Sequence, residues 1–520
     1  MTNSAQAMRM LITYAICIPL AIFMGFVMTE VGNNPDYSNL FVIGIVLAVL
    51  VSPIFIKWHY PIMVFGIGCP MVCFFLKGSP PLWQVVTILS LGIAIIERAI
   101  NSERRFIKAS VMTWPLLYTL AMVFLTAELT GGIGLKALGG DVGGGKKYLA
   151  LFIGIGMYFA LTSRPIPKEK RNLYVVLFFL AGAPSFISDL FPYLPSPLNY
   201  INFLFPPSQN VLNGDVSVGI TRLGSFAQTA GTVVNLMLVK YGLRGIFSSQ
   251  RPLRFLLFCT MMALTMLGGF RLTLISYSET ILLLFFLEGL HRTRMLLVFM
   301  FGGIVCLTLL IPFADKLPFT FQRALTVVPF LHLDPAARLD AEGSREWRET
   351  MWADTWPKVP QYLLLGKGYA LHADDFALMG GGDFQGLGAN LDRSQDGLAI
   401  SMDYHNGPLS TLMPFGVWGM ISYLWVGAAT LFILYRNYRY GDADLKTLNT
   451  FLMASGITSL VGFFFLFGAY SADIGGWAKL AGVSLAFNWE IQKAPALKTA
   501  INPLTRRLPV RPGRPKILPA

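Results

Sequence analysis

Long apolar runs alternate with short polar connections along most of this chain. About fourteen runs are long enough to cross a bilayer, whose hydrocarbon core of roughly 30 Å takes about twenty helical residues. Backbone polar groups inside lipid must be hydrogen-bonded within their own segment, so the pattern predicts an all-α, polytopic bundle of membrane helices. The predicted spans lie near residues 10–29, 39–56, 61–76, 81–97, 111–130, 148–163, 173–190, 226–241, 254–269, 273–290, 295–313, 407–435, 447–469 and 473–489.

One polar stretch of about ninety residues, from Ala314 to Tyr404, separates the eleventh predicted span from the twelfth. It is the part of the chain in which soluble chemistry could take place. The pattern therefore predicts four parts: spans 1–11 in residues 1–313, a large external loop in 314–404, spans 12–14 in 405–490, and a basic tail in 491–520.

The charges of the connections predict how the spans are oriented, because cytoplasmic connections carry an excess of Lys and Arg. The connections on one side are basic: 97–108, 163–172, 241–254, 291–294 and 435–446. Those on the other side include 28–39 and 470–476, which carry acid and no base, although Lys77 and Lys146–Lys147 are exceptions. Both termini are therefore predicted to be cytoplasmic. The large loop, with more Asp and Glu than Lys and Arg, is predicted to be periplasmic.

Composition narrows the possible function classes. Apolar residues make up 54% of the chain and charged residues 13%, against about 25% charged in an ordinary soluble domain. The net charge of +13 lies mainly in connections and in the tail, so it indicates membrane orientation and not nucleic-acid binding. All five cysteines lie in apolar runs, which favours packing over metal binding. A metal site built from His332, His372, Asp374 and Asp375 has no fixed ligand spacing, so we expect neither a metal nor a cofactor.

The candidate chemistry consists of arginines and one histidine on the predicted outer face. Arg222 lies in GITRLGSF, Arg271 in LGGFRLTLIS, Arg345 and Arg348 in GSREWRETMW, and His405 in DYHNGPLS. Guanidinium groups bind phosphate through two parallel hydrogen bonds, and several at one site could hold a diphosphate. A histidine at the same level could accept a proton from a sugar hydroxyl, since its pKa lies near working pH.

Structural explanations for these residues remain open. Arg222 and Arg271 could anchor span ends at the membrane interface by extending their charges into water. Arg345 and Arg348 could belong to a solvated helix face paired with nearby glutamates. Tyr404 and Trp352 could stack on sugar rings, but packing is the commoner role of such aromatic residues.

Together these segments resemble the O-antigen ligase and O-antigen polymerase superfamily. The resemblance runs from about Gly219 to Gly419: an Arg before a span, a turn with Arg271, an Arg-x-x-x-Trp in the outer loop followed by Gly-x-Gly, and a His-Asn-x-x-Leu followed by Gly-x-x-Gly. The last two elements are Arg348 with Trp352, Gly366 with Gly368, and His405, Asn406, Leu409, Gly416 and Gly419. The chain departs from the pattern at Gln228-Thr-Ala, at Phe270 and in having more than about twelve spans.

The resemblance implies transfer of a glycan from an undecaprenyl-diphosphate carrier to an acceptor hydroxyl, at the periplasmic face of a bacterial inner membrane. The acceptor would be a lipid A-core sugar, another lipid-linked repeat unit or a protein hydroxyl. The implied catalytic residues are His405, Arg271 and Arg348, and the implied substrate-binding residues are Arg222, Arg345, Asn406, Tyr404 and Trp352. A transporter or flippase for polar lipids or glycans is the main alternative, and a structural protein of the envelope is a second.

Overall fold

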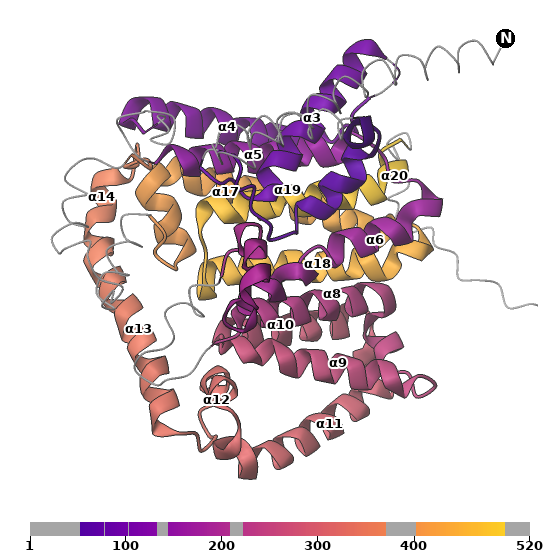
Figure 1. The fold of residues 1–520 in the computed structure, drawn as a ribbon, viewed down its shortest axis with the longest axis vertical. Coiled ribbons are helices and arrows are strands. Elements are labelled where there is room, and N and C mark those ends of the chain that lie inside the picture. Colours follow the sequence, from indigo (N-terminus) through magenta and orange to yellow (C-terminus); the bar gives the residue numbers. More distant parts are fainter. Residues whose placement is uncertain are drawn as a thin grey trace, which may run out of the picture.

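The computed structural model describes residues 53–76, 78–101, 103, 105–132, 144–207, 222–370 and 402–493. Within these residues the fold is helical, and the one β-type pairing is an isolated bridge between Val72 and Pro81. Figure 1 shows the long helices running side by side in a bundle. They are α3 (Leu82–Ile100), α4 (Ser110–Thr130), α5 (Gly145–Thr162), α6 (Arg171–Phe179), α8 (Gly224–Ile246), α9 (Pro252–Leu264), α10 (Arg271–Leu287), α11 (Met295–Leu310), α17 (Gly407–Tyr440), α18 (Lys446–Val461) and α19 (Tyr470–Phe487).

The all-helical membrane bundle predicted from the sequence agrees with this architecture. Six helical segments of the described chain are long and apolar enough to cross a membrane: Leu82–Ile100, Ser110–Thr130, Lys168–Asp189, Met295–Lys316, Gly407–Tyr440 and Ala443–Leu466. The predicted span at 10–29, nearly all of the one at 39–56 and nearly all of the tail lie outside the described residues. The number of fourteen spans and the orientation stay predictions.

The predicted break between the second and third spans is wrong. Residues 53–66 form one continuous helix, and residues 67–76 are turns and irregular chain. Two polar residues of the predicted connection are buried with partners: His59 Nδ1 lies 2.8 Å from Ser90 Oγ, and the Tyr60 hydroxyl donates to the Leu161 carbonyl over 2.8 Å. These hydrogen bonds make polar residues tolerable inside a packed helix, which the sequence pattern alone did not reveal.

Helix α17 is kinked at Gly416, where the outer segment docks onto it. Gly416 has φ +58°, and the kink leaves backbone groups of α17 free of their usual helical partners. Leu363 accepts a hydrogen bond from Val417 N–H over 2.7 Å, and Gly368 N–H donates to the Pro414 carbonyl over 2.9 Å. A Cβ on Gly366 would lie 2.3 Å from the Pro414 oxygen, so glycine is required for this approach.

Helix α13 (Pro335–Thr355) lies across one end of the bundle (Figure 1). The Asp334 side chain caps it by accepting from Ala336 N–H over 2.8 Å. It follows α12 (Phe319–Leu325), which packs near the start of α10, and leads through α14 (Val359–Tyr362) to the kink of α17. One helix therefore connects the two halves of the membrane region at the end where the predicted site residues lie.

Candidate functional site

An arginine that the sequence analysis missed organises the first half of the site. Arg323 of α12 is buried, with 6% of its surface exposed. Its Nε donates to the Asp340 carboxylate of α13, its Nη1 to the Gly269 carbonyl over 2.7 Å, and its Nη2 to Ser344 Oγ over 3.3 Å. It therefore ties together α12, α13 and the turn before α10. Its position within the short apolar helix FTFQRAL was the sequence signal that could have revealed it.

The two arginines predicted at span ends attach to the same turn of α13. Arg222 Nη2 lies 3.3 Å from Asp340 Oδ1, and Arg271 Nη2 donates to the Ala341 carbonyl over 3.0 Å. Asp340 thus serves two guanidinium groups, those of Arg222 and Arg323. The structure brings Arg222 and Arg271 together although 49 positions of sequence separate them (271 − 222).

Arg348 lies about two helical turns further along α13 and differs from the other arginines. Its side chain is half-buried, and its Nε is buried without a hydrogen-bond partner among the described residues. Burial lowers the pKa of the Arg348 guanidinium, and the charge of Arg323 acts in the same direction. An arginine nonetheless stays charged near neutral pH, so Arg348 offers an unpaired cation to an anionic ligand.

Arg345 lies on a solvated helix face, which is the structural explanation that the sequence left open for it. Its side chain is 67% exposed, and its Nε lies 3.2 Å from Glu349 Oε1 one turn on. Exposed ion pairs of this kind contribute little to stability. Arg345 therefore stands at the rim of the arginine cluster, within electrostatic range of Arg271 but directed to solvent.

His405 lies in a tight turn before α17 with its backbone at φ +49°, a conformation that a non-glycine residue seldom adopts. Its ring packs on Phe467, with centroids 4.5 Å apart, and against Trp347 at 5.7 Å. Its Nδ1 lies 3.8 Å from Asp403 Oδ1, too far for a hydrogen bond, and is buried without a partner in the described structure.

The surroundings of His405 favour its neutral form. Burial lowers the pKa of the imidazole, the negative charge of Asp403 raises it, and the positive charge of Arg348 lowers it, with burial the largest effect. The net direction is downward. A neutral imidazole at working pH can accept a proton, as a general base must.

The other predicted binding residues hold the His405 turn in place. Asn406 Oδ1 accepts from Leu409 N–H over 3.1 Å and so caps α17. Trp352 Nε1 donates to the Tyr404 carbonyl over 2.7 Å, which joins α13 to the turn. Tyr404 is 4% exposed, and its hydroxyl lies 3.2 Å from the Met402 sulfur. Asn406, Trp352 and Tyr404 therefore each have a structural role at the site.

Asp403 also lies near Lys147, a lysine on the side of the membrane where the sequence predicts few basic residues. Lys147, at the start of α5, is one of the exceptions to the charge pattern of the connections, and it is within electrostatic range of Asp403. Its Nζ lies 5.1 Å from the centroid of the Tyr369 ring. Lys147 and His405 therefore both lie within electrostatic range of the same carboxylate.

Arg348 connects the two parts of this candidate site. It lies within electrostatic range of both Arg271 and His405. Cations that can bind phosphate oxygens thus adjoin a neutral imidazole that can bind a hydroxyl. No group of three His, Cys, Asp or Glu residues is arranged to hold a metal ion in the part of the chain that the structure describes. Three residues of the weaker metal alternative, His372, Asp374 and Asp375, lie outside that part.

A comparison with known families gives a match over part of the chain. The O-antigen ligase family model matches residues 255–424, a region that contains Arg271, Arg348 and His405 and begins after Arg222. The match confirms the resemblance to the O-antigen ligase and polymerase superfamily over this region. It supports glycan transfer of the ligase or polymerase type by a multi-pass membrane protein. No curated protein matches the chain closely enough to serve as a relative.

Proposed function

We propose that this protein is a glycosyltransferase of the periplasmic face, which moves a glycan from an undecaprenyl-diphosphate carrier to an acceptor hydroxyl. One observation carries the proposal: Arg348 has a half-buried guanidinium that lies within electrostatic range of both Arg271 and His405, and its Nε has no hydrogen-bond partner among the described residues. No carboxylate balances this guanidinium among the described residues, and a bound diphosphate would supply the missing negative charge.

The reaction follows from these positions. The acceptor oxygen attacks the anomeric carbon of the donor sugar while its proton passes to the neutral imidazole of His405. The bond between the anomeric carbon and the phosphate oxygen breaks, and the electron pair leaves with the lipid diphosphate. Arg348 and Arg271 stabilise the charge that develops on the diphosphate. Attack from the face opposite to the leaving group inverts the anomeric centre.

Arg222 and Arg323 stabilise this arrangement without belonging to the proposed diphosphate site. Both are paired with Asp340, so they fix the turn of α13 to which Arg271 also binds. Their positive charge adds to the potential at the diphosphate without direct contact being required.

The lipid-linked glycans of a deletion strain test the proposal and separate its two main forms. Unattached long chains on the carrier indicate a ligase, and accumulation of single repeat units indicates a polymerase. Complementation with Arg348→Gln should reproduce the profile of the deletion strain, provided that the variant protein inserts normally. A deletion strain with the parental glycan profile would reject both forms.

The alternative of a glycan or lipid transporter makes a different prediction. Transport pathways place ionisable groups at the middle of the membrane, whereas Arg271 begins its helix and His405 precedes α17. Reconstituted vesicles should therefore form a glycosidic product from donor and acceptor supplied on one side. Movement of labelled donor across the vesicle membrane without product would favour the transporter.

A further inference from the structure

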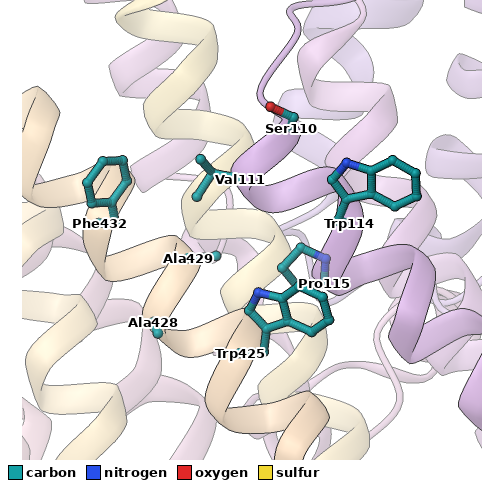
Figure 2. Close-up of a pocket in the computed structure, with 8 residues that line it drawn as sticks. All are labelled: Ser110, Val111, Trp114, Pro115, Trp425, Ala428, Ala429 and Phe432. Atoms are coloured by element: carbon teal, nitrogen blue, oxygen red, sulfur yellow. The ribbon is translucent and has the colours of Figure 1, made fainter.

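An apolar pocket lies between α4 and α17, away from the candidate site. Its volume is about 520 Å³, within the range of about 300–1,000 Å³ that is usual for small-molecule sites. Figure 2 shows its walls: Val111, Trp114 and Pro115 from α4 face Trp425, Ala429 and Phe432 from α17. Large parts of Trp114, Trp425 and Phe432 remain exposed, so this surface can accept an apolar ligand.

The pocket belongs to the far end of the bundle. His405 precedes the first residue of α17, and the pocket residues of that helix begin only at Trp425. From the kink at Gly416 to Phe432 there are sixteen residues, which span about 24 Å of helix. A ligand there would meet the membrane leaflet opposite to the one that adjoins His405.

Arg436 continues the pocket face of α17 toward that end. Trp425, Ala429, Phe432 and Arg436 follow one another at spacings of four, three and four residues, so they share one side of the helix. The side chain of Arg436 is partly buried, and its Nε and Nη2 are buried without a hydrogen-bond partner in the described part of the chain. Arg436 has no carboxylate partner among the described residues, and the proposed reaction does not use it.

The chain that leads into α4 is also basic. Arg105 and Lys108 precede the pocket residue Ser110, and both are exposed. Glu97 near the end of α3 pairs with Arg164, and Glu103 is the one acidic residue between α3 and α4, so this connection keeps a net positive charge. The apolar pocket therefore ends in a region of positive charge, a combination that matches a lipid with an anionic headgroup.

We propose that the pocket between α4 and α17 holds an acyl chain of an anionic phospholipid, with the lipid phosphate on Arg436. The lipid phosphate pairs with the partly exposed side chain of Arg436, one turn beyond the pocket, and the acyl chain fills the space between Trp114 and Trp425. Arg105 and Lys108 add the preference for a headgroup with net negative charge. The folded protein would then bind one lipid at this site whether or not the glycan donor is bound.

The test uses the purified full-length protein in vesicles that contain equal amounts of phosphatidylglycerol and phosphatidylcholine. After extraction in mild detergent, native mass spectrometry counts the retained lipids. The wild type should retain phosphatidylglycerol preferentially. Arg436→Gln should lower the ratio of phosphatidylglycerol to phosphatidylcholine about tenfold, the equivalent of one charge-assisted contact.

Two further variants keep the test decisive. Arg439→Gln removes the same charge from the same end of α17 but at an exposed position, and should leave the ratio within about twofold of the wild type. Ala428→Trp introduces a large side chain at the exposed rim of the pocket and should reduce retention of phosphatidylglycerol without changing any charge. Equal losses in Arg436→Gln and Arg439→Gln, or full retention in Ala428→Trp, would overturn the proposal.

Discussion

Arg323, which is buried, and Asp340, which is partly buried, form an ion pair that joins α12 to α13. Asp340 also pairs with Arg222, so a single carboxylate balances two of the arginines at this end of the bundle. Arg348, two turns along the same helix, has a buried Nε without such a partner. The arginines therefore divide into a group that maintains the structure and one that is available to a ligand.

Asp340→Asn should destabilise the protein strongly. The substitution keeps the size of the side chain but leaves the buried charge of Arg323 uncompensated, and loss of one partner of a buried pair costs about 3–5 kcal/mol. The measurement is the unfolding transition in detergent, compared with that of Glu349→Gln, which removes only an exposed partner of Arg345. Equal stability of the two variants would show that the pair does not hold α13.

Arg348→Gln should lower kcat/KM for glycan transfer by about 10²–10³-fold, the usual loss when one group that stabilises transition-state charge is removed. Arg345→Gln, three residues away on the same helix, should retain activity within a few-fold because that side chain points to solvent. Arg348→Lys separates charge from geometry, since lysine keeps the charge but loses the fork. Similar losses in the two glutamine variants would assign the effect to general electrostatics.

His405→Asn should reduce kcat by about 10²–10⁴-fold, the usual contribution of a general base. Asparagine is the suitable replacement because it tolerates positive φ, whereas alanine would add backbone strain at φ +49°. The protein should remain folded, with an unfolding transition close to that of the wild type. Near-normal turnover by His405→Asn would remove the imidazole from the mechanism.

Asp403→Asn should move the acidic limb of the rate–pH profile to lower pH. The negative charge of Asp403 raises the pKa of His405, so its removal lowers that pKa further. A general base works in its neutral form, and a lower pKa keeps it neutral at more acidic pH. The measurement is kcat/KM against pH for both proteins. A shift of the acidic limb toward neutral pH would contradict the assigned roles.

Gly416→Ala should impair folding of the site because a Cβ would lie 2.4 Å from the Leu363 oxygen and the residue has φ +58°. Both effects act where the outer segment docks on α17, so activity and thermal stability should fall together. Gly343→Ala is the matched control: it lies inside α13 with no heavy atom within 4 Å of the added Cβ. Alanine there should be neutral or stabilising by about 1 kcal/mol.

Arg345 and Arg348 show how much residue spacing along the chain can predict about a site. The sequence indicated that they share one helix face if the segment is helical, and α13 is helical. Positions three apart nevertheless differ by about 60° around a helix axis. That angle leaves Arg345 in solvent and half-buries Arg348 beside Trp347 and His405. Which of the two is available to a ligand depends on the packing of α13, not on its own sequence.

Arg323 and Asp340 show what local patterns miss. The apolar residues around Arg323 are the one local signal, and nothing around Asp340 distinguishes it from an ordinary aspartate in a polar segment. Their importance arises from contacts with Gly269, Arg222 and Ser344, which come from other parts of the chain. The same holds for the buried partners of His59 and Tyr60, which turned a predicted break into continuous helix.

The sequence by itself determined that this is a helical membrane protein and which short segments carry arginine and histidine, because hydrophobic length and residue type are local properties. The tertiary structure alone decided which of these side chains meet. Only packing of α13 across the bundle sets Arg348 near both Arg271 and His405, pairs Arg222 and Arg323 with Asp340, and joins Trp352 to Tyr404. Such long-range contacts depend on the positions of whole helices, and these positions follow from the total packing of the chain.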